Sequence, residues 1–214
     1  GYLPEGMRNY LARLGWAHGD DELFSDAQAL EWFDLAGVGK APARLDFDKL
    51  AHVNAHWIRL ADDDRLAKMT LDMHLARGHA LGPDDEARLL KALPFVKDRA
   101  KTALELADQT AFVLRSRPLR IYEKGLPMMT GDSGERIARL RDRLSLFASW
   151  DVFALEAELK VFAEEEAVGF GKIGPAVRAA LTGDGVSPDI AKTLAALGRE
   201  ESLGRLDDAL QQTI

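Results

Sequence analysis

The sequence has 214 residues, of which 47% are hydrophobic, a formal net charge of −7 and no cysteine. The lack of cysteine excludes disulfide bonds, thiolate metal sites and a cysteine nucleophile, and no apolar run approaches the ~20 residues of a membrane-spanning helix. The first residues also lack the charged-then-apolar pattern of a signal peptide. We therefore expect a cytoplasmic protein with a buried core, in one large or two small domains.

The first part of the chain has the apolar spacing of helices. Pro4 fits a first helical position, and apolar residues recur at helical spacing up to Gly15. Ser25 can cap a second helix that runs through Ala36, and Asp46 can cap a third. These signals predict three helices before residue 61.

The next signals are acidic runs and prolines. The aspartates at 62–64 favour the N-terminus of a helix that reaches about Arg77, because negative charge stabilises that end. Pro83, followed by two aspartates, starts another helix. Pro94 interrupts it, and residues 95–114 have the spacing of one long helix.

Residues 116–134 break the helical pattern with two prolines and three glycines, so they are the best candidate for a domain boundary. No alternating strand pattern of useful length is present, and the sequence therefore predicts an all-α fold. Beyond the break we expect helices at about 135–148, 151–168, 171–181, 188–197 and 199–212.

The charge distribution bears on nucleic-acid binding. A negative net charge argues against a polyanionic partner, because like charges repel. However, the segment from Leu93 to Arg143 holds 11 basic and 7 acidic residues, a net charge of +4, and the rest of the chain carries −11. Such a segment is compatible with an RNA-binding surface and, as the plainer alternative, with a solvated helix surface.

Candidate catalytic and metal sites are weak. His52 and His56 have the helical spacing of two zinc ligands, but Val53 stands where the zinc-protease pattern needs glutamate. Ser133 lies in a GDSG string without the strand and turn of a nucleophile elbow. We therefore expect no metal site and no catalytic residue in this chain.

Three stretches carry a resemblance to a known family. The opening GYLPEGMRNYLARLGW (1–16) is similar to G-Y-L-P-E-A-x-x-N-Y-L-x-x-L-G-W, with Gly6 in place of alanine. The stretch at 40–59 is similar to K-S-P-A-x-F-D-x-x-K-L, although its aromatic positions differ. Residues 171–210 contain R-x-A-L-T-G, then S-P, then L-G-R-E in place of L-G-K-E. Together they resemble the bacterial glutamyl-tRNA synthetases, which are class I aminoacyl-tRNA synthetases.

The resemblance implies a part of an enzyme. The HIGH-type and KMSKS-type motifs that bind ATP in this family are absent from the sequence. We therefore expect a catalytic domain upstream and no aminoacylation by this chain alone. In the full-length enzyme, ATP and Mg²⁺ would serve to charge tRNA with glutamate, while this segment would hold no cofactor. The implied partners are glutamate tRNA and the upstream domain, with no membrane, and we expect a monomer.

The resemblance also implies a division of the chain. A helical stem-contact region at 1–66 would precede a helical anticodon-binding domain made of two subdomains, at 67–120 and 121–214. One alternative is a freestanding helical interaction module, derived from such an enzyme, that binds a protein partner. Another is a relaxed synthetase that also charges glutamine tRNA.

Two arginines are the main candidates for anticodon recognition. The resemblance places Arg99 at the arginine associated with the third anticodon base, and Arg178 at the one associated with the middle or neighbouring base. Glutamate anticodons end in C, and cytosine offers acceptors on its Watson–Crick edge where guanine offers N–H donors, so an arginine there would favour cytosine. The plainer alternative for Arg99 is an ion pair with Asp98 or Glu105.

The remaining candidates come from the same resemblance. Ser187 and Pro188 match a turn that approaches the first anticodon base, and S-P-D also predicts Ser187 as a helix N-cap with Pro188 at the first helical position. Asn54 and Arg59 are candidates for contacts with the tRNA stem backbone, which fix register and do not read sequence.

Overall fold

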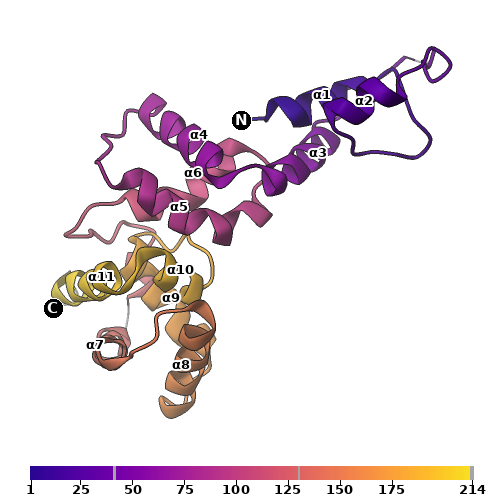
Figure 1. Ribbon diagram of the computed structural model, residues 1–214. Coiled ribbons are helices and arrows are strands. Elements are labelled where there is room, and N and C mark those ends of the chain that lie inside the picture. The colour runs from indigo at the N-terminus through magenta and orange to yellow at the C-terminus, as the bar shows by residue number, and fades with distance from the viewer. Residues whose placement is uncertain (41, 130, 213–214) are drawn as a thin grey trace. The chain divides into compact units, whose positions relative to one another are not determined.

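The computed structural model describes residues 1–40, 42–129 and 131–212. Within these ranges it contains eleven α-helices, three short 3-10 helices and no strand (Figure 1), so the all-α prediction is confirmed. None of the helices in the described ranges has both the length and the apolar character needed to cross a bilayer. The chain forms two compact units, a first unit of Gly1–His79 with Val96–Asp108 and a second unit of Ala80–Phe95 with Gln109–Ile214.

The first unit is built around two helices that pack together. Helices α1 (Pro4–Arg13) and α3 (Phe47–Leu60) lie side by side (Figure 1), and α4 (Asp63–Ala76) follows α3 in the chain. Tyr10 of α1 is buried against Leu50 of α3, and other apolar side chains surround this contact. The predicted helical stripes of both segments thus meet in one core.

The predicted N-caps of the first unit are confirmed. Ser25 forms a capping box with Gln28 at the start of α2 (Asp26–Trp32). The Asp46 carboxylate accepts hydrogen bonds from two backbone N–H groups of α3, and the Asp62 carboxylate caps α4 by accepting from one, the N–H of Arg65. Each of these caps satisfies donors that the first turn of a helix leaves unpaired.

The predicted end of α2 at Ala36 is wrong. The helix ends at Trp32, and the backbone becomes extended at Phe33. The Asp34 carboxylate then accepts a hydrogen bond of 2.6 Å from the N–H of Gly37, which closes a turn in place of further helix.

The predicted helix over residues 95–114 is also wrong. Helix α5 (Asp85–Val96) continues through Pro94, and the chain then forms a 3-10 turn, helix α6 (Ala103–Thr110) and a second 3-10 turn. Contacts that are distant in sequence cause the break. The side-chain amide of Asn54 donates a hydrogen bond to the carbonyl of Lys101, and the N–H of Ala103 donates to the carbonyl of Gly1 at 2.8 Å.

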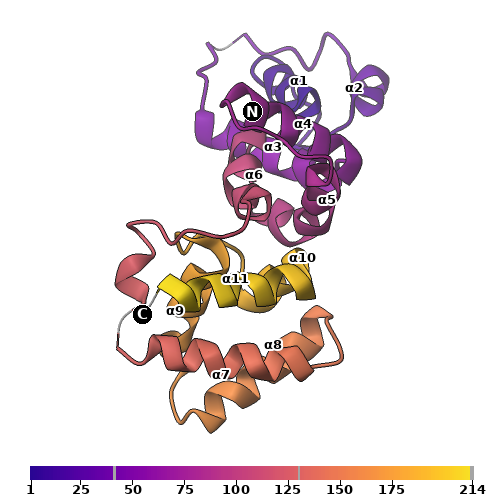
Figure 2. The same ribbon diagram turned by 90° about the vertical axis from the view of Figure 1, so that its left-hand side faces the viewer.

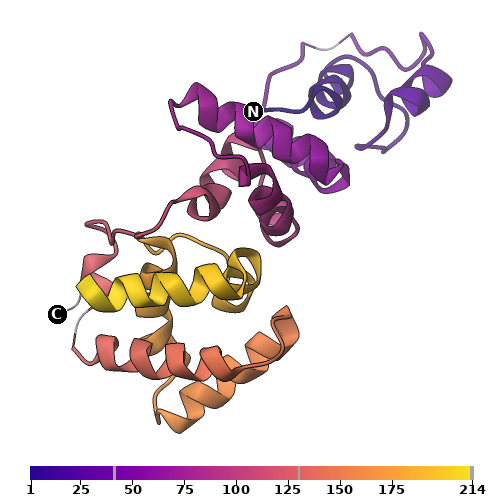
Figure 3. The same cartoon turned by 60° about the vertical axis from the view of Figure 1, so that its left-hand side comes forward.

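The second unit contains the five helices expected after residue 134, each within a few residues of its predicted bounds. These are α7 (Ser133–Leu146), α8 (Val152–Glu165), α9 (Phe170–Thr182), α10 (Ile190–Leu197) and α11 (Arg199–Gln212). Figures 2 and 3 show α7 and α11 side by side. The core between these helices includes Ile137, Leu140, Leu144, Leu155, Leu159, Phe162, Ile173, Val177, Leu181, Leu194 and Leu206.

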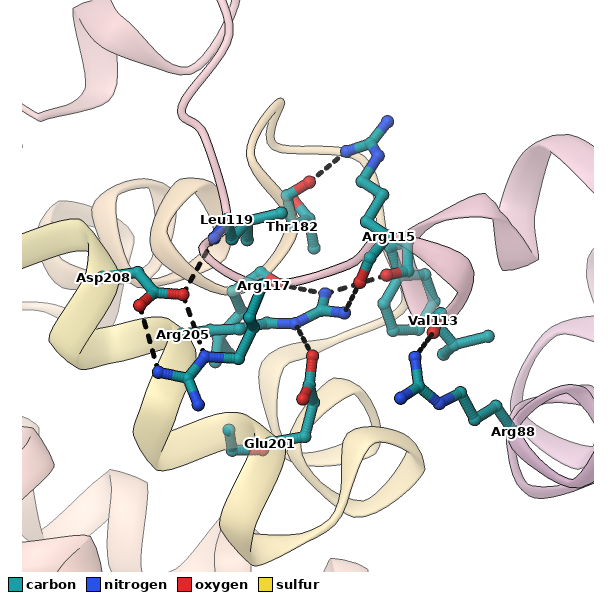
Figure 4. Close-up of polar contacts among 12 residues, drawn as sticks. Arg88, Val113, Arg115, Arg117, Leu119, Thr182, Glu201, Arg205 and Asp208 are labelled. Carbon is teal, nitrogen blue, oxygen red and sulfur yellow. Dashed lines mark hydrogen bonds and ion pairs between the residues drawn. The ribbon is translucent and has the colours of Figure 1, made fainter. Parts of the chain in front are cut away.

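A buried arginine of α11 binds the backbone of residues 112–115, which include the second 3-10 turn (Figure 4). Arg205 of α11 is fully buried, and its guanidinium donates to the Glu201 carboxylate at 2.6 Å. It also donates at 2.8 Å each to the carbonyls of Phe112, Leu181 and Arg115. Because these carbonyls belong to two different segments, one side chain ties both to α11.

A second ion pair holds the same segment. Arg117 forms a bidentate pair with Asp208 of α11, at 2.9 and 3.0 Å, and the N–H of Leu119 donates to the same carboxylate at 2.8 Å (Figure 4). The start of the predicted break at 116–134 is therefore bonded to α11, and the described part of this segment also contains a 3-10 helix at Leu126–Met128.

Candidate nucleic-acid interface

Arg178 lies near the end of α9, where its guanidinium is half-buried. Nη2 donates to the carbonyl of Pro188 at 3.3 Å, and no ion pair with a carboxylate is formed within the described ranges. The Nε group is buried and has no described acceptor. Buried polar groups normally have partners, so this guanidinium retains donor capacity that the fold does not use.

Ser187 and Pro188 lie in the turn between α9 and α10. The predicted cap is wrong, because Asp189 is the N-cap of α10 and its carboxylate accepts from the N–H of Lys192 at 3.1 Å. Pro188 is buried and precedes the helix. The Ser187 hydroxyl has no capping role and donates to the carbonyl of Pro188 at 2.9 Å. The competing cap is the stronger one here because the carboxylate is placed one residue before the first helical turn.

The structure thus brings three of the predicted residues together in the second unit. Arg178 and Ser187 both donate to the carbonyl of Pro188. A half-buried guanidinium, a hydroxyl and a proline turn therefore meet at one point. Because Pro188 is buried and the Ser187 hydroxyl already donates to its carbonyl, the guanidinium of Arg178 is the group that this turn positions for a ligand.

Arg99 lies in the first unit, at the end of the 3-10 turn Lys97–Arg99. Its side chain is exposed and forms no ion pair among the described residues, whereas the neighbouring Lys97 pairs with Asp63 at 2.7 Å. The alternative pair of Arg99 with Glu105 is not formed, because that carboxylate accepts from the N–H of Lys101 at 2.7 Å. Arg99 is therefore available to solvent, in a different unit from Arg178.

Asn54 and Arg59 both lie on α3 but have different environments. Asn54 is fully buried, accepts from the N–H of Leu3 at 2.7 Å and donates to the carbonyl of Lys101 at 2.6 Å. Arg59 is exposed in the last turn of α3. One turn earlier, burial, together with the charge of Arg59, lowers the pKa of His56 below its ordinary value. This face of α3 therefore presents the Arg59 cation beside a neutral histidine.

The basic segment at 93–143 is mostly neutralised by ion pairs. Seven of its eleven cations contact carboxylates, namely Lys97, Arg115, Arg117, Arg136, Arg139, Arg141 and Arg143. The four without a described ion pair are Arg99, Lys101, Arg120 and Lys124. The net charge of +4 thus overstates the positive surface, because counting along the sequence cannot show which carboxylates fold onto these cations.

Sequence reasoning missed a groove in the first unit. A groove of about 820 Å³ lies between α1 and the start of α3, and its lining includes Arg13, Arg44, Lys49 and His52. Arg44 and Lys49 are exposed and form no ion pair in the described part of the chain. The sequence gives no local signal for this groove, because its lining comes from two segments that only the fold brings together.

Across the described ranges, no group of three or more His, Cys, Asp or Glu residues is placed to hold an ion.

Comparison with known proteins decides the family. Residues 64–210 match the family described as "Anticodon binding domain". The chain belongs to this anticodon-binding domain family. Arg99, Arg178, Ser187 and Pro188 all lie inside the matched range.

Curated relatives of this anticodon-binding domain have longer sequences. The chain is 55% identical over 210 residues to "Glutamate--tRNA ligase" of Caulobacter vibrioides. This match covers 98% of this chain and 45% of the relative. It is 56% identical to the protein of the same name from Caulobacter sp. strain K31, over 98% of this chain and 44% of the relative. The chain therefore spans less than half the length of the curated relatives that it matches.

A solved structure shows the same fold. The crystal structure of a glutamate tRNA ligase from Elizabethkingia meningosepticum, in complex with its amino acid, aligns over all of this chain and 42% of that chain. The TM-score is 0.81 at 22% sequence identity. The helical arrangement described above is thus shared with that protein.

Proposed function

We propose that this chain is the tRNA-binding, anticodon-recognising C-terminal part of a glutamate–tRNA ligase. The family match, the names of the relatives and the share of their length that the chain covers support this proposal. The observation that carries it is the guanidinium of Arg178, half-buried without a carboxylate partner and held beside the Ser187–Pro188 turn.

The division of the chain is part of the proposal. A stem-contact region at 1–66 precedes two anticodon-binding subdomains at 67–120 and 121–214. The start of the family match at residue 64 supports the first boundary. The second boundary lies in the non-helical segment that follows α6 and its 3-10 turn.

Anticodon recognition is assigned to hydrogen-bond donors. Arg99 donates to the acceptors of a cytosine at the third anticodon position and disfavours guanine, which offers N–H donors at the same edge. Arg178 serves the middle or neighbouring base, and the Ser187–Pro188 turn lies against the first base. The exposure of Arg99 and the unused donors of Arg178 support these assignments.

Contacts with the tRNA stem are assigned to exposed cations of the first unit. Arg59, together with Arg44 and Lys49 of the groove beside α1, binds backbone phosphates without reading sequence. The Asn54 side chain is fully buried, and a direct contact with RNA would require the loss of its hydrogen bonds to Leu3 and Lys101. We therefore give Asn54 the role of holding α3 in place and leave the backbone contact to these cations.

The catalytic steps belong to the rest of the ligase. In the full-length enzyme, ATP and Mg²⁺ serve the charging of tRNA with glutamate in an upstream catalytic domain, and no residue of this chain is assigned to either. We further propose that the protein is cytoplasmic and monomeric, and that this segment alone does not aminoacylate.

The test is binding of the 214-residue chain to a glutamate tRNA transcript as a function of salt. We expect log Kd to rise with log salt concentration, with a slope of about 0.7 to 0.9 per phosphate contact. Arg178→Gln should weaken discrimination between transcripts that differ in the anticodon. The matched control is Arg139→Gln, which also removes one arginine charge, from a side chain that pairs with Glu166. Kd that is independent of salt, or equal effects of the two variants, would refute the proposal.

A further inference from the structure

The loop from Gly183 to Asp189 carries Ser187 and Pro188, and its path is set at its start. Gly183 ends α9 with φ +83°, a left-handed conformation that glycine adopts without strain. Its carbonyl accepts from the N–H of Tyr122 at 2.7 Å. A Cβ on Gly183 would lie 2.7 Å from the carbonyl oxygen of Arg120, so the backbone of the 120–122 segment is in close contact there.

Arg115 holds the same loop from another segment. One guanidinium nitrogen donates to the carbonyl of Thr182, and Nη2 lies 2.5 Å from the Asp184 carboxylate (Figure 4 shows the first contact). The guanidinium also lies over the ring of Tyr122, 5.2 Å from its centre. The backbone carbonyl of Arg115 is in turn bonded to the buried Arg205. Arg115 is thus fixed at both ends.

Asp184 connects Arg115 to the next residues of the loop. Its second carboxylate oxygen accepts from the N–H of Val186 at 3.1 Å, and the carboxylate is less than one-fifth exposed. Although burial opposes the charged form, the hydrogen bond from Arg115 holds the pKa of Asp184 below its ordinary value. The carboxylate is therefore ionised at neutral pH and bridges Arg115 to the residue before Ser187.

We infer that the Arg115–Asp184 pair is a positioning latch, which sets the Ser187–Pro188 turn and the Pro188 carbonyl against the Arg178 guanidinium. The inference rests on the proposed function, because it concerns recognition of the anticodon. Neither latch residue contacts RNA in this role. Each acts through the backbone of residues 184–188, and the two side chains come from positions 69 residues apart.

A positioning role and a purely electrostatic role of Asp184 predict changes in different quantities for one variant. Asp184→Ala removes a negative charge near the proposed RNA site, which by charge alone should tighten tRNA binding. If Asp184 positions the turn, the same variant should lose discrimination at the first anticodon base, although the protein has become less acidic. The matched control is Asp207→Ala, because Asp207 also forms a bidentate pair with an arginine, Arg141, in the same unit.

The experiment measures Kd of the 214-residue chain for glutamate tRNA transcripts that differ only in the first or only in the third anticodon base. Circular dichroism of every variant checks folding. We expect Asp184→Ala and Arg115→Ala to reduce first-base discrimination about fivefold or more, which is the low end for one good base contact. Third-base discrimination, assigned to Arg99 in the other unit, should be kept, and Asp207→Ala should change neither ratio.

Two kinds of failure are distinguishable. If the unmodified chain binds all transcripts equally, the proposed function fails and the latch fails with it. If the unmodified chain discriminates, an unchanged first-base ratio in Asp184→Ala overturns the latch alone. Equal loss of first-base and third-base discrimination also overturns it, because that result shows a general loss of structure.

Discussion

Replacement of Arg205 by methionine should destabilise the second unit strongly. Arg205 is fully buried and donates four hydrogen bonds, one to the Glu201 carboxylate and three to backbone carbonyls. Methionine keeps much of the side-chain length but none of the donors. Each hydrogen bond to a charged group contributes about 1.5–3 kcal/mol, but the sum is an upper limit because desolvation of the guanidinium offsets part of it.

The measured effect of removing one partner from a buried ion pair is about 3–5 kcal/mol, and we expect Arg205→Met to fall in this range. This is a fifth or more of the ~5–15 kcal/mol by which a typical domain is stable. The free energy of unfolding of Arg205→Lys should lie between those of Arg205→Met and the unmodified chain. An ammonium group keeps the charge but cannot reach all four acceptors.

The assay is urea unfolding followed by circular dichroism, with peptide-resolved hydrogen exchange to locate the loss. Exchange should increase most in peptides that contain residues 112–115, the end of α9 and α11. The control is Arg141→Met, which removes a half-exposed pair with Asp207 and should cost about 0–1 kcal/mol. The reasoning would be refuted if Arg205→Met cost no more than this control.

Further predictions concern recognition, stability, acid sensitivity and catalysis. In the full-length enzyme, Arg99→Gln should reduce the ratio of kcat/KM for glutamate over glutamine tRNA by about 1–3 kcal/mol of discrimination, and an unchanged ratio with intact folding would contradict its role. Asn54→Ala should lower the free energy of unfolding by about 2–4 kcal/mol, because the buried N–H of Leu3 and the half-buried carbonyl of Lys101 both lose a partner; urea titration beside the exposed-site variant His52→Ala checks this. The hydrogen bond from Arg117 lowers the pKa of Asp208 despite its burial, so the pair stabilises the fold at neutral pH, and this stabilisation is lost as pH falls from about 3.9 through the lowered pKa. Between pH 7 and pH 3 the melting temperature of Asp208→Asn should therefore fall less than that of the unmodified chain, and an equal fall would remove Asp208 from the explanation. The 214-residue chain should release no pyrophosphate from ATP in the presence of glutamate and tRNA, and activity in a preparation free of full-length enzyme would show that the proposed division is wrong.

Local signals in the sequence were sufficient for most helix starts. Ser25, Asp46 and Asp62 cap the helices that follow them, because a cap depends on side chains and backbone groups within three residues. The helix predicted over 95–114 failed for the opposite reason. Its break depends on a hydrogen bond from Asn54 to Lys101, 47 residues away, which periodicity cannot show.

The candidate site divides in the same way. Arg178, Ser187 and Pro188 lie within a short stretch and meet in the structure. Their assignment to the anticodon comes from a family resemblance and stays a prediction. Asp184 and Arg115 carry no motif, and only the fold brings them together.

The ion pairs of the basic segment have a consequence for how tRNA would arrive. Most arginines between residues 93 and 143 already hold carboxylates, and the whole chain carries −7. A net negative charge repels a polyanion at long range, so the association rate gains nothing from electrostatic steering by the chain as a whole. We expect anticodon contacts to form mainly after another part of the ligase has captured the tRNA, since tethering supplies a high effective concentration. The anticodon contacts would then form on a tRNA that is already bound, and a wrong anticodon would be selected against by faster dissociation of that tRNA.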